Sequence, residues 1–175
     1  MSPNLDPAAP GSNADSEHRP LPSEPEGIPW AFAEAWNAGD PDGIAALFAP
    51  DADFVNVTGI WWTDREAIRR AHAYGLERIF PDSRLAVGRI RVRSPGPGVA
   101  VVHSRMTLDG QSPHPDSPHP QRRVTIFSFV GVEGEGGWRC VSAHNTDVVA
   151  GAETHLRGED GELRAVDYRI TDPEG

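Results

Sequence analysis

The chain has 175 residues, of which 38% are hydrophobic and 24% are charged, and its 26 acidic and 16 basic residues give a formal net charge of −10. A chain of this length typically forms one domain that buries a core without disulfide or metal crosslinks. The negative charge argues against nucleic acids and anionic membranes as partners, because both require basic patches on the protein.

The residue types that are missing exclude several kinds of chemistry. Every basic residue is an arginine, so the chain forms no Schiff base and anchors no pyridoxal phosphate. The single cysteine, Cys140, allows neither an internal disulfide nor a cysteine-based zinc cluster. No apolar segment reaches membrane-spanning length. We therefore expect a cytoplasmic protein that uses no metal and no organic cofactor.

Three segments divide the chain. Residues 1–24 are rich in Pro, Ser, Gly and Asn, and we expect them to form a disordered arm. Residues 25–150 carry the periodic apolar patterns of a folded domain. Residues 151–175 form an acidic tail that we expect to be partly ordered. Its string EDGE either joins two short edge strands or belongs to an arm that wraps a neighbouring subunit.

Helix signals lie in the first half of the domain. The first helix is predicted to begin near Pro29, and a short second helix to span 41–48. Thr63 and Glu66 have the spacing of a capping box, which predicts a third helix over 64–80.

Strand signals surround and follow the third helix. The segments rich in β-branched and aromatic residues are 52–58, 85–92, 99–108, 123–132 and 138–149. Helices followed by antiparallel strands predict an α+β fold in which the helices pack on one face of a curved sheet.

Several strings resemble those of a known family. AWNAGD (35–40), LFAPDADFVNVTGIWW (47–62) and AHNTD (143–147) resemble the SgcJ/EcaC branch of the SnoaL-like proteins, in the nuclear-transport-factor-2-like superfamily. The string GAETHLRGEDGELRAVDYR (151–169) is similar to members from enediyne polyketide biosynthesis. The resemblance implies a cone-shaped domain whose curved antiparallel sheet and about three helices enclose a pocket. It also implies a homodimer formed through the backs of two sheets.

The resemblance leaves the reaction open, because the superfamily includes isomerases, cyclases, dehydratases and non-catalytic proteins, and a fold does not determine a function. The oxidoreductase label attached to this branch finds no support in the sequence. No GxGxxG string follows a predicted strand, and no flavin motif is present.

His144 and Asn145 are adjacent on the last predicted strand, so their side chains point to opposite faces of the sheet. Simple alternation groups His144 with Trp138 and Cys140, and Asn145 with Ala143. If His144 faces the pocket, it is a candidate acid/base. If it faces outward, it is an interface residue and Asn145 orients a substrate carbonyl. Both arrangements remain open.

Two further histidines are candidates. His103 shares a strand face with Arg105. The two side chains either bind an oxyanion or enolate together, or they lie at an exposed end of the strand without a function. His72 lies on the apolar stripe of the third helix, where it is either a core residue or part of the roof of the pocket. We expect His103 or His144 to transfer the proton, and Arg105 and His72 to contact the substrate.

Three residues of the 47–62 region are candidates for substrate binding. Asn56 can polarise a carbonyl, and Trp61 and Trp62 offer indole surfaces for a flat polyene or polyketide. We expect one tryptophan to face the ligand and the other to pack against a helix. His114 and His119 lie in a loop that lacks the further ligands of a closed metal site.

Two functions follow from these residues. The first is an enzyme that performs cofactor-independent acid/base chemistry, such as isomerisation, dehydration or cyclisation, on an apolar polyketide intermediate. The second is a non-catalytic protein that sequesters a reactive polyene or assists an iterative polyketide synthase.

Overall fold

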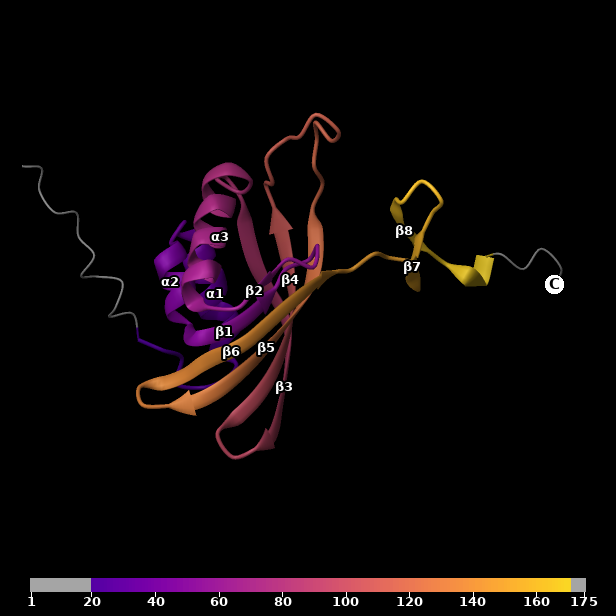
Figure 1. The fold of residues 1–175 in the computed structure, drawn as a ribbon. Helices are drawn as coiled ribbons and strands as arrows, with labels where there is room; N and C mark the ends of the chain where they lie inside the picture. The colour runs from indigo at the N-terminus through magenta and orange to yellow at the C-terminus, as the bar shows by residue number, and fades with distance from the viewer. Residues whose placement is uncertain (1–19, 171–175) are drawn as a thin grey trace, which may run out of the picture.

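The computed structural model describes residues 20–170, and the predicted arm over 1–24 falls almost entirely outside the described residues. Figure 1 shows helices gathered on one side of a long, curved sheet, with a small hairpin standing away from both near the C-terminus. No helix in the described part of the chain combines the length and apolarity needed to cross a bilayer.

Three helices form the layer on one face of the sheet. They are α1 (Gly27–Asn37), α2 (Pro41–Ala46) and α3 (Arg65–Arg78). Asp40 caps α2, since its carboxylate accepts a hydrogen bond of 2.8 Å from the backbone N–H of Gly43. All three helices lie where the sequence predicts them.

The N-terminal cap of α3 differs from the prediction. Asp64, rather than Thr63, caps the helix by accepting a hydrogen bond of 2.7 Å from the backbone N–H of Ala67. Glu66 bonds to the guanidinium of Arg69 instead of returning to the cap. The capping-box prediction is wrong because an aspartate one residue later meets the free backbone donors first.

Six strands build the main sheet. They are β1 (Phe48–Val55), β2 (Trp61–Trp62), β3 (Arg84–Gly96), β4 (Val99–Asp109), β5 (Arg123–Gly134) and β6 (Gly137–Asp147), in the spatial order β2-β1-β6-β5-β4-β3. Neighbouring strands are antiparallel except for β1 and β6, which are parallel. The predicted antiparallel sheet is therefore mixed. No hairpin joins β1 to β6, so no tight turn sets their relative direction.

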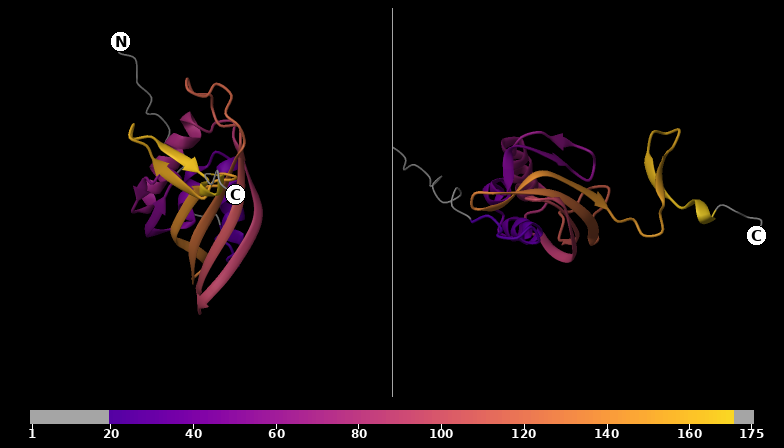
Figure 2. Two further views of the ribbon diagram at one scale, coloured as in Figure 1. Left: turned by 90° about the vertical axis from the view of Figure 1, so that its right-hand side faces the viewer. Right: turned by 90° about the horizontal axis from the view of Figure 1, so that it is seen from below.

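The helices cover only one face of this sheet (Figures 1 and 2). Along β4 every second side chain, from Ala100 to Leu108, is buried beneath the helical layer. The core between the layers is aromatic, and Phe32, Phe48 and Phe129 are completely buried in it. We call the covered side the inner face and the other side the outer face.

The C-terminal tail forms a separate hairpin. β7 (Thr154–Arg157) pairs with β8 (Leu163–Val166), and a short 3-10 helix, η2 (Tyr168–Ile170), follows. The two predicted short strands are thus present, but within the described residues they pair only with each other. Figure 1 and the right view of Figure 2 place the hairpin away from the helices.

Candidate functional site

A pocket of about 420 Å³ lies between α1, α3 and the inner face of the sheet. Most of its lining surface is apolar, and its aromatic side chains include Phe32, Trp36, Phe54, Trp62, Phe80 and Phe127. Its polar lining side chains include Asn56, His72, Gln111, Arg123, Thr125 and Asn145. A largely apolar hollow with a few polar groups is the usual form of a small-molecule site.

His72 lies on α3 inside a cage of aromatic rings. Its ring centroid is 5.2 Å from that of Phe54, 5.7 Å from that of Phe32 and 5.9 Å from that of Trp62. Its Nδ1 lies 2.8 Å from the backbone carbonyl oxygen of Ile68. Because a carbonyl only accepts, Nδ1 must carry the hydrogen, and Nε2 then holds the lone pair.

The aromatic cage also changes the acidity of His72. Burial lowers the pKa of the imidazole from 6.5 to about 4, against a smaller opposing effect of the hydrogen bond to Ile68. The side chain is therefore neutral at pH 7. The residue lines the pocket, and its Nε2 is a proton acceptor.

Asn145 brings an unsatisfied polar atom to the pocket. It lies on β6 directly opposite Phe127 of β5. Its Oδ1 is buried and receives no hydrogen bond from any described residue. A buried carbonyl oxygen without a donor costs about 1–3 kcal/mol. A ligand hydroxyl that donates to it would recover part of that cost.

Arg123 and Asn56 add polar groups with fixed positions. The guanidinium of Arg123 makes two hydrogen bonds of 3.0 Å to the carboxylate of Asp147 and one of 3.3 Å to Oε1 of Gln111. Asn56 uses its Oδ1 to accept three hydrogen bonds that close the loop to Ile60. Among the described residues no hydrogen bond uses the Asn56 amide nitrogen, which remains a possible donor.

The structure separates the two histidines predicted to transfer the proton from this pocket. His103 of β4 pairs directly with Ser128 of β5, which in turn pairs with His144 of β6. Directly paired residues share a face, and His144 is exposed. Both histidines, together with Arg105, therefore lie on the outer face, so we correct their expected placement at the pocket.

The two tryptophans also have different positions. Trp62 lines the pocket, with its ring centroid 5.6 Å from that of Phe54. Trp61 is 64% exposed and donates a hydrogen bond of 2.7 Å to the carboxylate of Asp53. The expectation that the second tryptophan packs against a helix is therefore wrong for Trp61.

Four polar residues of the pocket escaped the sequence analysis: Thr58, Gln111, Arg123 and Thr125. Arg123, Thr125 and Phe127 are two residues apart along β5, so their side chains share one face of the sheet. Once Phe127 is known to face inward, this spacing places Arg123 and Thr125 at the pocket as well. Within residues 20–170, no group of three or more His, Cys, Asp or Glu side chains is arranged to hold a metal ion.

Comparison with solved structures supports the fold. An uncharacterized protein with a cystatin-like fold from Caulobacter vibrioides is 33% identical, with a TM-score of 0.64, over 70% of this chain and 86% of that chain. A proposed dehydratase of the NTF2-like family from Streptomyces avermitilis is 18% identical, with a TM-score of 0.59, over 70% and 92%. A proposed scytalone dehydratase from Novosphingobium aromaticivorans is 16% identical, with a TM-score of 0.56, over 80% and 87%.

Comparison with protein families gives the assignment. No curated protein matches the chain significantly. A family model described as the SnoaL-like domain matches residues 31–172, which is most of the chain. The six-stranded curved sheet, the three covering helices and the enclosed pocket agree with this match. The chain therefore belongs to the SnoaL-like domain family.

Proposed function

We propose that the chain is a cofactor-independent enzyme that isomerises or dehydrates an apolar small molecule, with His72 as the proton-transfer group. One observation carries this proposal. His72 is the histidine that lines the aromatic pocket, and its Nδ1 hydrogen bond leaves the lone pair on Nε2. Two of the structural neighbours bear names of proposed dehydratases, which is consistent with such chemistry on this fold.

The geometry suggests how a proton would move. Nε2 of His72 removes a proton from the carbon next to a substrate carbonyl, and Nδ1–H keeps its bond to Ile68 while the ring is charged. The resulting enolate oxygen needs a donor, which Arg123 or the Asn56 amide can supply. Returning the proton to another carbon completes an isomerisation. Returning it to a β-hydroxyl group releases water and completes a dehydration.

The pocket favours a flat, conjugated substrate. Its volume of about 420 Å³ and its aromatic walls suit a polyene or a partly cyclised polyketide. The buried Oδ1 of Asn145 would accept a hydrogen bond from a hydroxyl on that molecule. The strings that resemble the SgcJ/EcaC branch support a polyketide intermediate of the enediyne type as the specific substrate class.

Deuterium exchange tests the proposal without knowledge of the natural substrate. A conjugated β-hydroxy ketone is incubated with the protein in D2O, and NMR follows deuterium incorporation next to the carbonyl and loss of water. We expect the wild-type protein to accelerate exchange and His72→Gln to reduce the acceleration by about 10²–10⁴-fold. The matched control is His144→Gln on the outer face, which should exchange like wild type. Equal rates for wild type and His72→Gln would overturn the proposal.

A second candidate is a non-catalytic binding protein for the same class of molecule. The pKa of about 4 favours it, because a histidine with so low a pKa is a weak base, and in a binding protein its Nε2 would accept a hydrogen bond without removing a proton. In that case any effect on the polyene would rise in proportion to protein concentration and stop at one equivalent. It would depend on Trp62 more than on His72.

A further inference from the structure

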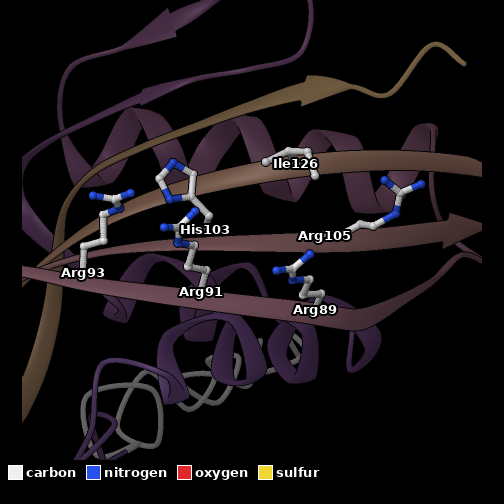
Figure 3. Close-up of a pocket in the computed structure, with 6 residues that line it drawn as sticks. All are labelled: Arg89, Arg91, Arg93, His103, Arg105 and Ile126. Atoms are coloured by element: carbon white, nitrogen blue, oxygen red, sulfur yellow. The ribbon is translucent and has the colours of Figure 1, made fainter. Parts of the chain in front are cut away.

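The outer face of the sheet carries a groove of about 430 Å³ that is separate from the aromatic pocket. Its lining residues are Arg89, Arg91 and Arg93 of β3, His103 and Arg105 of β4, and Ile126 of β5. Figure 3 shows the three arginines of β3 following one another along the strand, with His103 beside Arg91. Arg91 and His103 are also direct partners in the strand pairing.

A β-bulge in β3 builds this arrangement. Val87 pairs with Met106 and Ile90 pairs with Ser104, and both partners are completely buried. Val87 and Ile90 therefore both point to the inner face although three positions separate them. The two residues between them stand opposite a single residue of β4, which is the definition of a bulge.

The bulge consists of Gly88 and Arg89, opposite Arg105. A Cβ atom at Gly88 would lie 2.8 Å from the carbonyl oxygen of Arg105, so a side chain there would clash with backbone. After the bulge, normal alternation places Arg91 and Arg93 on the outer face with Arg89. The bulge thus turns to the outer face three arginines that uninterrupted alternation from Val87 would place together on the inner face.

Arg89, Arg91, Arg93 and Arg105 have no carboxylate partner among the residues that the structure describes. None of the four forms an ion pair or a hydrogen bond with any residue that the structure describes, although Arg122, Arg123 and Arg164 each hold a carboxylate. Asp109, the carboxylate on the same face of β4, is bound by Arg122 at 2.9 Å. Like charges on neighbouring strands repel each other, so an anion bound between them would stabilise the sheet.

We propose that this groove binds a small molecule with two or more phosphate or carboxylate groups. Arginines two positions apart on a strand are separated by roughly 7 Å, and Arg89 and Arg93 by roughly 13 Å, so separate anionic groups can each meet a guanidinium. The planar guanidinium matches both kinds of group with paired hydrogen bonds. This site goes beyond the proposed function, because it lies on the opposite face of the sheet from His72.

Two macromolecular occupants fit the surface less well. A nucleic acid would approach a chain whose net charge is −10, which repels a long polyanion. A second copy packed symmetrically on the same face would bring two sets of the four arginines together. On β3 and β4 the described outer-face carboxylate is Asp109, which Arg122 already binds, so neither set of arginines would meet a free carboxylate on these two strands of the other copy. A compact oligoanion meets neither obstacle.

Isothermal titration calorimetry of the full chain at low ionic strength tests the site. Pyrophosphate and citrate are the probes, and orthophosphate and chloride are the comparisons. We expect pyrophosphate or citrate to bind with one site per chain, and which of the two binds more tightly identifies phosphate or carboxylate chemistry. The double substitution Arg91→Gln and Arg105→Gln should weaken this binding at least about tenfold. The control double substitution Arg70→Gln and Arg78→Gln, on α3, removes the same charge elsewhere and should leave the binding unchanged.

Three results would overturn the proposal. The first is that neither probe binds more tightly than orthophosphate. The second is that the α3 control, Arg70→Gln with Arg78→Gln, weakens binding as much as Arg91→Gln with Arg105→Gln, which would make the attraction a property of overall charge. The third is that light scattering shows a dimer that Arg91→Gln with Arg105→Gln dissociates, without any probe binding to the wild-type protein. The surface would then be an interface between two copies.

Discussion

His144 and Asn145 are neighbours in the chain, but they lie on opposite faces of β6. Asn145 lines the aromatic pocket, and its Oδ1 is buried there without a donor. His144 is exposed on the outer face, opposite Ser128. Of the two, only the amide is placed to contact a molecule in the pocket.

The unsatisfied Oδ1 of Asn145 predicts a conflict between stability and binding. Replacing a buried, unpaired polar group by an apolar group of similar size is often neutral or stabilising. We therefore expect Asn145→Leu to leave the free energy of unfolding unchanged or to raise it by up to about 1 kcal/mol. The same change should weaken binding of a hydroxylated polyene. Urea denaturation and quenching of tryptophan fluorescence measure the two effects.

His144→Leu is the matched control for this experiment, because it makes a similar change one residue away on the outer face. Its affinity for the polyene should equal that of wild type. A marked loss of stability in Asn145→Leu, without change in His144→Leu, would show that the amide is satisfied in the unliganded protein.

His72 predicts a specific dependence of stability on pH. Its pKa is about 4 in the folded state against 6.5 for the free side chain, so between these values the unfolded chain binds more protons. The free energy of unfolding should therefore be highest above pH 6.5 and fall as the pH drops toward 4. The full difference amounts to roughly 3 kcal/mol.

Carboxylates also titrate in this pH range and change the stability. The quantity to measure is therefore the difference in the free energy of unfolding between wild type and His72→Phe at each pH. The phenylalanine keeps a ring in the aromatic cage but cannot take up a proton. Subtracting the two denaturation curves at each pH should leave the contribution of the imidazole alone. If the free energies of unfolding of the two proteins change in parallel from pH 7 to pH 4, the lowered pKa of His72 is contradicted.

Trp61 and Trp62 should differ in their effect on stability. Trp62 packs against Phe54 and His72, whereas Trp61 is largely exposed. Truncating a buried aromatic side chain costs about 3–5 kcal/mol, and Trp62 is half-buried, so we expect Trp62→Ala to cost roughly 2 kcal/mol. Trp61→Ala should cost less than about 1 kcal/mol. Thermal denaturation of both variants checks the order, and an equal loss would contradict it.

Most of the helices and long strands could be predicted from the sequence, because apolar periodicity is a local property. The exceptions are β1, which begins at Phe48 rather than at residue 52, and the two-residue strand β2, which was not predicted. The face on which a strand residue lies could not be predicted. Alternation from Trp138 and Cys140, both buried, would place His144 on the inner face. A shift in the pairing of β5 with β6 lies between Cys140 and Ser142, and it exchanges the two faces.

The same limitation applies to β3, where the bulge at Gly88 brings Arg89 to the outer face with Arg91. A bulge depends on how two strands pair, and a single strand's sequence does not contain that information. The role of His72 was easier to anticipate, since the helical period of 3.6 places it on the apolar stripe of α3. Its aromatic cage comes from α1, β1 and β2 and needed the tertiary structure.

Cys140 offers a natural probe of unfolding that needs no engineered thiol. The side chain is completely buried on β6, and burial raises the pKa of its thiol, so almost no thiolate is present in the folded protein. We expect a disulfide reagent such as dithionitrobenzoate to react only when the sheet opens. The rate at pH 8 should therefore follow the free energy of unfolding and increase with urea. Thr146→Cys in a Cys140→Ser background places an exposed thiol on the same strand and should react at once. Rapid reaction of Cys140 without urea would show that β6 separates from β1 or β5 in the native state.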